Sequence, residues 1–138
     1  KYLPAFLKQL ENSDVVIGSR YVRGGGSEEW SALRRFISGL GNLGIRWVAG
    51  LKVHDSTSGF KAFRISALQG LDMDIFRCSG FGFQVEVAHA CQQLGYRIIE
   101  HPIIFKKRAY GKSKMSVFIV AEALWKLFFL RWRTQMRN

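Results

Sequence analysis

Cysteine is scarce in this chain of 138 residues, which contains only Cys78 and Cys91. Two cysteines are too few for the disulfide framework of a small extracellular domain, and neither has the ligand neighbours of a zinc site. Cys91 falls in an apolar helical pattern, so we expect it to be a buried small hydrophobic residue. The first residues also lack the long apolar segment of a secretory signal. These absences make a reducing, cytosolic environment the expectation.

Acidic residues are also few. Ten Asp and Glu stand against 21 Lys and Arg, which gives a formal net charge of +11. This excess favours an anionic partner (phosphates, nucleic acid or an anionic membrane) over a protein that is basic without such a partner. Nucleic acid is disfavoured because the aromatic residues fall at core-like positions and do not alternate with lysines as a stacking platform. The hydrophobic content of 48% excludes a disordered chain, and the length suits one domain.

The apolar segment 117–130 is too short to span a membrane. As a helix it would extend about 21 Å, whereas the hydrocarbon core of a bilayer is about 30 Å thick. Glu122 and Lys126 interrupt the segment and share one helical face, and Arg131 and Arg133 follow it. The pattern predicts an amphipathic helix. It lies either at a membrane interface, which the clustered tryptophans and arginines favour, or against the protein's own sheet.

The remaining sequence alternates between helical and strand-like patterns, which predicts an α/β protein. The apolar run at 14–19 reads as a short buried strand, which is consistent with a parallel sheet. Pro4 suits the first turn of a helix, Gly95 suits a helix end, and Pro102 indicates an edge strand or a bulge. The expected helices cover 3–12, 30–49, 66–71 and 83–95, and the expected strands cover 14–19, 60–65 and 97–105.

Three glycines interrupt the helical pattern of 30–49. Gly39, Gly41 and Gly44 each weaken a helix by up to about 1 kcal/mol relative to alanine. They indicate either close packing against a neighbour or a break in the helix, and both readings stay open.

Polar side chains concentrate in three short segments. Residues 55–64 contain a carboxylate, three hydroxyls, a glycine and two cations, and residues 80–86 and 108–114 are similarly rich in glycine and polar groups. Such loops usually hold a polyhydroxylated or phosphorylated ligand. The three segments therefore predict a substrate site that is assembled from loops on an α/β scaffold.

Several strings along the chain match a known family in order and spacing. They are 14–21 with 24–26 and Trp30, 34–38, 55–60 with Arg64, 82–86, 101–103, and Arg108 with 111–114. Together they resemble the C-terminal part of the polyprenol-phosphate sugar transferases, the dolichol-phosphate mannose synthase group of the inverting GT-A glycosyltransferases of family 2. The resemblance covers almost the whole chain. It implies an incomplete, Rossmann-like GT-A fold with a mixed sheet that comprises mainly the acceptor-side half (1–115), followed by an amphipathic membrane-interface helix and basic tail (116–138).

The resemblance implies transfer of mannose from GDP-mannose to dolichyl or another polyprenyl phosphate, with inversion, by a peripheral protein on the cytoplasmic side of a membrane. Relatives that transfer glucose or other sugars from UDP donors are one alternative. A non-catalytic basic module that binds a membrane surface or nucleic acid is an alternative of another class. The sheet edge left open by a missing half would favour a homo-oligomer or aggregation.

For the acceptor phosphate, the resemblance implies contacts from Arg20, Arg34 and Ser38. This phosphate is already ionised at neutral pH, so it needs orientation and charge neutralisation more than a strong base. Arginine suits this task because its planar fork binds phosphate and stays charged. Arg34 and Ser38 are four residues apart on one helix, whereas Arg35 is one step round. A solvent-facing arginine and a serine bonded to its own helix are the alternative.

For the donor diphosphate, the resemblance implies a closing loop around Gly111. Arg108, Lys112 and Lys114 belong to this loop, and Arg108 would also act in catalysis by offsetting the charge of the leaving group. A lysine-rich turn without that role is the alternative.

Two carboxylates are candidates for the catalytic site. Asp55 and Glu86 would contact sugar hydroxyls or position the reacting centre, and Ser58 and Gly59 would let the backbone approach the donor sugar. Because Gln84 and Glu86 are two residues apart on a predicted helix, at most one of them is expected in the site, and we prefer Glu86.

Metal ligands are not expected in this chain. In the family, an Asp-x-Asp motif that holds Mg²⁺ or Mn²⁺ belongs to a nucleotide-binding half, which precedes the region matched here. The cation is therefore expected for the complete enzyme only, and the isolated chain is expected to be inactive. Asp72 and Asp74 have a suitable spacing but read better as turn carboxylates. The histidines His54, His89 and His101 lack metal-ligand spacing and are expected to be structural or exposed.

Overall fold

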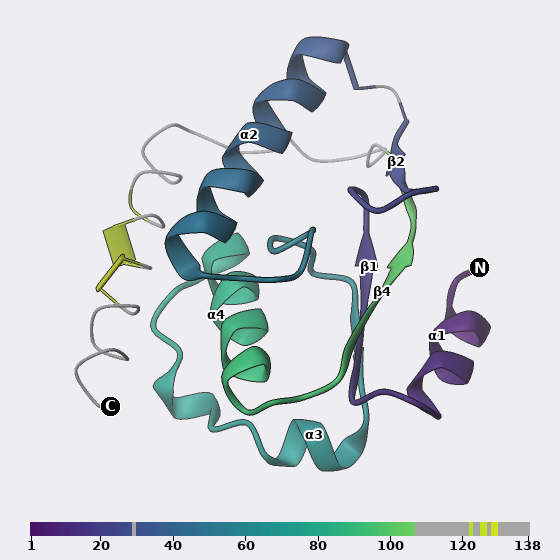
Figure 1. Cartoon of the computed structure of the whole chain (residues 1–138), viewed down its shortest axis with the longest axis vertical. Coiled ribbons are helices and arrows are strands. Elements are labelled where there is room, and N and C mark those ends of the chain that lie inside the picture. The colour runs from purple at the N-terminus through teal and green to yellow at the C-terminus, as the bar shows by residue number, and fades with distance from the viewer. Residues whose placement is uncertain (29, 107–121, 123–124, 127, 130–138) are drawn as a thin grey trace.

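The computed structural model describes residues 1–28 and 30–106, together with residues 122, 125, 126, 128 and 129 (Figure 1). The predictions for Arg108, Lys112 and Lys114 lie outside the described residues. So does most of the segment 116–138, for which a membrane-interface helix was expected.

A mixed three-stranded sheet forms the centre of the fold, as the family resemblance implied. It contains β1 (Val15–Ser19), β3 (Lys61–Phe63) and β4 (Ile98–Pro102) in the order β3-β1-β4. β1 pairs with β3 in antiparallel fashion and with β4 in parallel. Pro102 ends β4 at the edge of this sheet, in agreement with the predicted edge position. The expected strand 97–105 is divided there, because β5 (Ile104–Phe105) pairs instead with β2 (Gly26–Ser27).

Within residues 1–28 and 30–106, four α-helices and one short 3₁₀ helix accompany the strands. Pro4 lies in the first turn of the first helix, and Gly95, with φ of +73°, follows the last one in the left-handed conformation that favours glycine. The helix that was expected over 83–95 begins three residues earlier, at Gly80. The helices are α1 (Leu3–Leu10), α2 (Ala32–Ala49), α3 (Ile65–Gln69), η1 (Met73–Ile75) and α4 (Gly80–Gln93).

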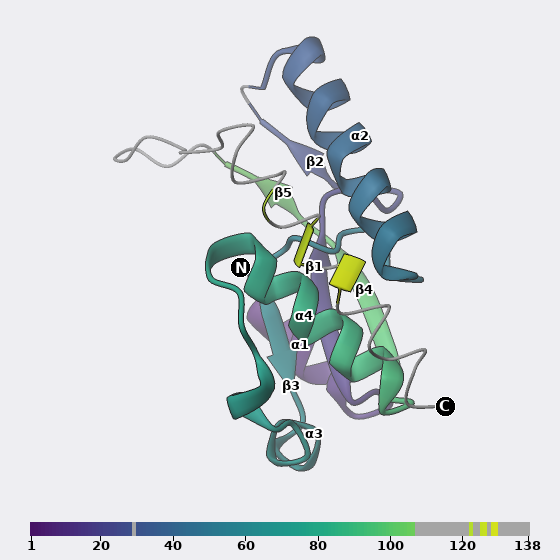
Figure 2. The ribbon, with the colours of Figure 1, turned by 90° about the vertical axis from the view of Figure 1, so that its left-hand side faces the viewer.

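The core lies on both faces of β1. Side chains alternate along a strand, so Val15 and Ile17 face one side and Val16 faces the other. The first side packs against residues of α4, including Cys91, which is buried as predicted. The second side packs against Phe6 of α1. Accordingly, α4 and α1 lie on opposite faces of the sheet (Figure 2).

Helix α2 is continuous through its three glycines. Ser31 caps its start by accepting a hydrogen bond from the backbone of Arg34, and Gly50, with φ of +66°, ends it. Among the residues that the structure describes, a Cβ added at Gly39, Gly41 or Gly44 would meet no atom within 4 Å. Within this part of the chain, the three glycines therefore neither break the helix nor allow a close contact with a neighbour.

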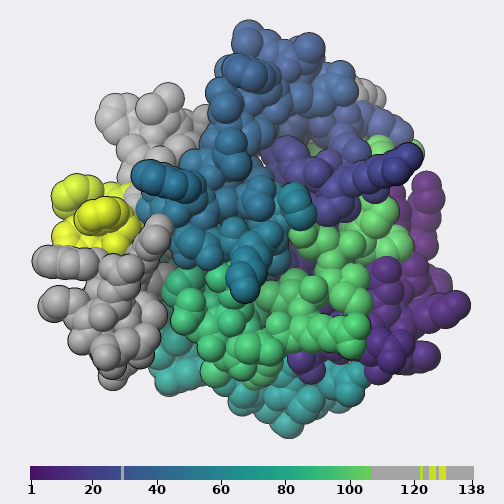
Figure 3. Space-filling model, in the orientation of Figure 1, coloured from purple at the N-terminus to yellow at the C-terminus, as the bar shows by residue number. Residues whose placement is uncertain are grey.

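Helix α2 turns a polar and small-residue side to the fold and an apolar side outward. Asn42, Ile45 and Ala49 are buried. The outward side is a continuous stripe at helical spacing, with side chains 53–80% exposed, and α2 lies on the molecular surface (Figure 3). We call this stripe the α2 apolar face; it consists of Leu33, Phe36, Ile37, Leu40, Leu43 and Trp47. Within the described part of the chain, none of the helices has the length and apolar character that a membrane crossing requires.

Candidate functional site

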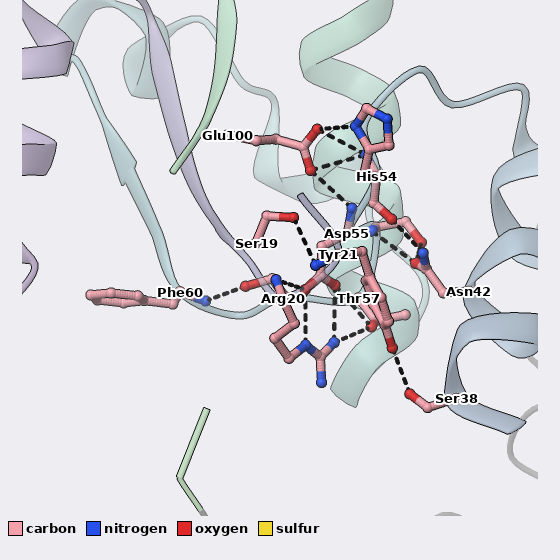
Figure 4. A network of polar contacts seen from close by, with 12 residues as sticks. Ser19, Arg20, Tyr21, Ser38, Asn42, His54, Asp55, Thr57, Phe60 and Glu100 are labelled. Carbon is pink, nitrogen blue, oxygen red and sulfur yellow. Dashed lines mark hydrogen bonds and ion pairs between the residues drawn. The ribbon is translucent and has the colours of Figure 1, made fainter. Parts of the chain in front are cut away.

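Arg20 follows β1 directly and is held by a buried carboxylate. Its Nε and Nη2 donate to the two oxygens of Asp55 at 2.8 and 2.9 Å, and its backbone N–H donates to Oδ2 at 3.0 Å. Asp55 is fully buried, whereas the Arg20 side chain is 15% exposed. Figure 4 shows the two side chains facing one another. Burial lowers the pKa of Arg20, but the hydrogen bond and charge of Asp55 raise it by more, so the net pKa is raised and the guanidinium stays charged.

The guanidinium of Arg20 is hydrogen-bonded along one side. Thr57 accepts a further hydrogen bond from Nη2 at 3.0 Å, so Nε and Nη2 are fully occupied. Within the described part of the chain, no hydrogen-bond acceptor contacts Nη1. Among these residues, the two N–H groups of Nη1 therefore have a fixed direction and no partner.

The loop that carries Asp55 is anchored from two elements. Glu100 of β4 accepts hydrogen bonds from the backbone N–H groups of His54 and Asp55 at 2.9 Å. From α2, Asn42 accepts from the backbone and hydroxyl of Ser56 and donates to the carbonyl of His54. The exposed ring of His54 lies 2.8 Å from Glu100, which fits the expected structural role of this histidine. The carboxylate of Asp55 is thus fixed before any ligand binds.

Arg34 and Ser38 face the same region from α2. The guanidinium carbon of Arg34 lies 4.7 Å from the ring centroid of Trp30, and that of Arg20 lies 5.8 Å from the same ring. Ser38 Oγ lies 2.6 Å from the hydroxyl of Tyr21, so its contact is with the loop after β1 and not with its own helix. The three residues predicted to bind the acceptor phosphate therefore gather around two aromatic side chains.

Sequence reasoning assigned no role to these two aromatic residues. Trp30 and Tyr21 fall within the matching strings, and their spacing from Arg20 and Arg34 is visible in the sequence. Whether they contact Arg20, Arg34 and Ser38 depends on the path of the loop between β1 and α2, and no local sequence pattern specifies that path. Phe105 completes the aromatic surroundings of Arg20, with its ring centroid 5.7 Å from the guanidinium carbon.

Ser58 and Gly59 lie beside Gln84 and Lys61. The ammonium group of Lys61 donates to the carbonyl of Ser58 and, at 2.9 Å, to Gln84 Oε1. A Cβ at Gly59 would lie 3.6 Å from Gln84 Nε2. Burial lowers the pKa of Lys61 to about 8, against the opposing charge of Asp55. A cation of this kind, buried near a candidate site, was not singled out from the sequence.

Glu86 lies elsewhere on α4 and is buried. Its carboxylate accepts hydrogen bonds from the backbone N–H groups of Arg77 and Cys78, at 3.1 and 2.9 Å, and so fixes the chain just before the helix. Gln84, rather than Glu86, faces the backbone of Ser58 and Gly59. A direct part for Glu86 in catalysis stays a prediction.

Asp72 is engaged in its own turn. Its carboxylate accepts from the backbone N–H of Asp74 at 3.1 Å and caps the short η1 helix, as expected of a turn carboxylate. Among the residues that the structure describes, no group of three His, Cys, Asp or Glu side chains is placed to hold a metal ion. His101 lies edge-on to the rings of Tyr2 and Phe6, and His89 is buried in α4.

The fold and the site together define an α/β protein with a mixed sheet, whose loops and one helix gather two arginines around aromatic side chains. No protein-family model matches this chain. It is 43% identical over 122 residues to the undecaprenyl-phosphate mannosyltransferase of Micrococcus luteus, covering 88% of this chain and 50% of that protein. It is 35% identical over 115 residues to the polyprenol monophosphomannose synthase of Mycolicibacterium smegmatis, covering 83% and 43%.

Over most of its length, the chain is therefore homologous to part of the polyprenol-phosphate mannosyltransferases, which confirms the resemblance found in the sequence. It spans about half the length of the curated relatives it matches.

Proposed function

We propose that this chain is the acceptor-side part of a GT-A glycosyltransferase that transfers a mannosyl residue to the phosphate of a polyprenol. The observation that carries the proposal is the grouping of Arg20, Arg34 and Ser38 around Trp30 and Tyr21. The names of both relatives, which specify mannose and a polyprenol phosphate, support it. They favour mannose over the glucose and binding-module alternatives.

The chemistry is a single displacement. An oxygen of the acceptor phosphate attacks the anomeric carbon of the sugar, the bond from that carbon to the diphosphate oxygen breaks, and the diphosphate leaves with its electron pair. Attack from the side opposite the leaving group inverts the anomeric centre. Two anions must approach one another, so the site has to supply positive charge in a fixed direction.

The two arginines supply this charge in different ways. Asp55 cancels much of the charge of Arg20 but aims its Nη1 group. Arg34 is held by the face of Trp30, and in the described part of the chain no carboxylate forms an ion pair with it. A cation–π contact orients a guanidinium without neutralising it. Arg34 is thus the main source of net positive charge for the phosphate.

The donor side is proposed on the resemblance alone. GDP-mannose and a divalent cation, Mg²⁺ or Mn²⁺, are proposed for the complete enzyme. The described residues offer no cluster that fits such an ion, so no step is derived through it from this chain. Arg108, Lys112 and Lys114 remain proposed contacts to the donor diphosphate.

A membrane surface is proposed as the location of the reaction, on its cytoplasmic side. The α2 apolar face supports this, because an exposed stripe of large apolar side chains on an amphipathic helix suits the boundary between headgroups and acyl chains. Arg34 and Ser38 lie on the same helix but off this stripe. A lipid in the membrane could therefore present its phosphate to the inward side of α2 while its hydrocarbon stays at the apolar face.

The experiment uses the full-length protein that contains this chain. Transfer of labelled sugar to undecaprenyl phosphate is measured with GDP-mannose and UDP-glucose as donors, and undecaprenol without phosphate is the control acceptor. The proposal predicts transfer from GDP-mannose that requires the acceptor phosphate. Preference for UDP-glucose would show that the proposed donor is wrong. No transfer from either nucleotide sugar would contradict the proposed transferase function.

A further inference from the structure

The hydroxyl groups of Tyr21 and Ser38 form a short contact across the candidate site. Their oxygens lie 2.6 Å apart, and the two residues are 17 positions apart in the sequence. Tyr21 belongs to the loop after β1, directly beside Arg20, and Ser38 lies on the inward side of α2, one turn after Arg34. Both side chains are half-buried, and Figure 4 shows their hydroxyl groups pointing toward one another. This contact joins the loop that carries one arginine to the helix that carries the other.

Either oxygen can be the donor of this hydrogen bond, and a bound phosphate would require one of the two directions. Each hydroxyl has one hydrogen, so only one of the two oxygens can be the donor in their shared bond. A phosphate ester carries about −1.5 to −2 charges at neutral pH and offers acceptor oxygens. Ser38 can donate to it only if Tyr21 donates to Ser38. The phenol is also the more acidic of the two hydroxyls, which favours the same direction.

We propose that Tyr21 is a positioning residue of the acceptor site, whose hydroxyl donates to Ser38 Oγ and so directs the Ser38 hydrogen toward the acceptor phosphate. This inference rests on the proposed function. The chain of two hydrogen bonds ends on an anion, and such a chain polarises along its length, so the bond from Ser38 to phosphate is stronger with Tyr21 in place. Tyr21 needs no contact with the substrate.

The ring of Tyr21 adds a second restraint. Its centroid lies 5.3 Å from the guanidinium carbon of Arg20, so the same side chain contacts both parts of the site. Loss of the hydroxyl leaves this ring contact intact. Tyr21→Phe therefore removes the hydrogen bond alone and is the informative variant.

The experiment measures steady-state kinetics of the full-length enzyme for Tyr21→Phe, Ser38→Ala and the double variant. Tyr21→Phe is expected to raise the KM for polyprenyl phosphate about 5- to 10-fold, as for loss of one hydrogen bond, and to leave the KM for the donor unchanged. The double variant is expected to equal Ser38→Ala, because Tyr21 acts only through Ser38. Tyr96→Phe is the matched control, since its hydroxyl donates to the carbonyl of Ala67 in another part of the fold.

The outcomes distinguish a failure of this inference from a failure of the proposed function. If Ser38→Ala raises the acceptor KM and Tyr21→Phe does not, or if the two effects multiply in the double variant, the role of Tyr21 is overturned while the acceptor site stands. If Ser38→Ala leaves the acceptor KM unchanged, the acceptor site itself is wrong, and the inference falls with it. An equal effect of Tyr96→Phe would indicate a general loss of stability and would also overturn it.

Discussion

Arg20 and Arg34 carry the same guanidinium group, but their partners differ. Arg20 is paired with the buried carboxylate of Asp55, and Arg34 lies against the ring of Trp30. The sequence predicted both arginines as ligands of one phosphate, and the structure brings them to one aromatic ring. What the sequence could not show is that Asp55 orients Arg20. The expected contact of Asp55 with the sugar stays a prediction. Asp55 and Arg20 are 35 positions apart, and their pairing depends on the loop fixed by Glu100 and Asn42.

Lys61 gives a pH-dependent test at the scale of one residue. Burial lowers its pKa to about 8, below the value of 10.5 that is ordinary for lysine. Between these two values the unfolded chain binds more protons than the folded one, so this residue makes the free energy of unfolding rise with pH. Replacement by methionine removes the titrating group. Between pH 7 and pH 11, wild type is therefore expected to gain up to about 3 kcal/mol in the free energy of unfolding from this residue, and Lys61→Met is expected to lack this gain.

Urea denaturation of the full-length protein at both pH values measures this difference. Lys8→Met, at an exposed position on α1, is the matched control. A difference between wild type and Lys61→Met that stays constant with pH would show that the lysine is not held in a desolvated position.

At the scale of elements, α2 shows what a sequence pattern predicts and what it does not. Its apolar residues at helical spacing predicted the helix over nearly its full length, and Ser31 and Gly50 define its ends. Of the large apolar residues that form this pattern, only Ile45 is among the buried residues; the pattern consists of Leu33, Phe36, Ile37, Leu40, Leu43, Ile45 and Val48. A polar residue, Asn42, is buried instead because its amide bonds the 54–56 loop. Periodicity identifies the faces of a helix, but which face meets the fold depends on contacts made elsewhere in the chain.

The glycines of α2 give the first prediction at this scale. Gly39→Ala and Gly44→Ala should each raise the free energy of unfolding by about 0.5–1 kcal/mol, because alanine favours a helix and an added Cβ meets open space. Thermal or urea unfolding of the full-length protein measures the change. Gly25→Ala is the contrasting variant and should destabilise, since its Cβ would overlap the carbonyl oxygen of Ser19. Destabilisation by Gly39→Ala would show that another segment packs against the helix there.

The α2 apolar face gives the second prediction at this scale. Replacing both Leu40 and Leu43 by glutamine is expected to weaken binding to anionic phospholipid vesicles about tenfold or more, because two large apolar side chains no longer enter the membrane interface. Both positions are exposed, so the stability of the fold should change little. Co-sedimentation with vesicles measures the binding.

Leu68→Gln is the control for this pair, because Leu68 is similarly exposed but belongs to α3. If the double variant binds vesicles as well as wild type, the α2 apolar face is not a membrane contact. An equal loss in Leu68→Gln would instead show that binding does not depend on this helix in particular.

At the scale of the whole molecule, the sequence pattern predicted the order of most elements, and the family resemblance implied the mixed sheet. The apolar run of β1 indicated a strand buried on both sides, and the structure places it at the centre of the sheet, between α1 and α4. The assembly of the site could not be predicted as well from the sequence. Its parts come from the end of β1, the 54–57 loop and α2, which no local pattern brings together, so only the family resemblance grouped Arg20, Arg34 and Ser38 in advance.

The most direct test of the account is the affinity of the full-length protein for a short-chain polyprenyl phosphate, measured by calorimetry for wild type, Arg34→Ala and Arg35→Ala. Arg34 and Arg35 are both exposed on α2, so the two variants are matched in charge and in expected stability. The account predicts that Arg34→Ala weakens binding about 10- to 100-fold, as for loss of a charged hydrogen bond, and that Arg35→Ala binds nearly as wild type. Equal affinities for Arg34→Ala and wild type would contradict it.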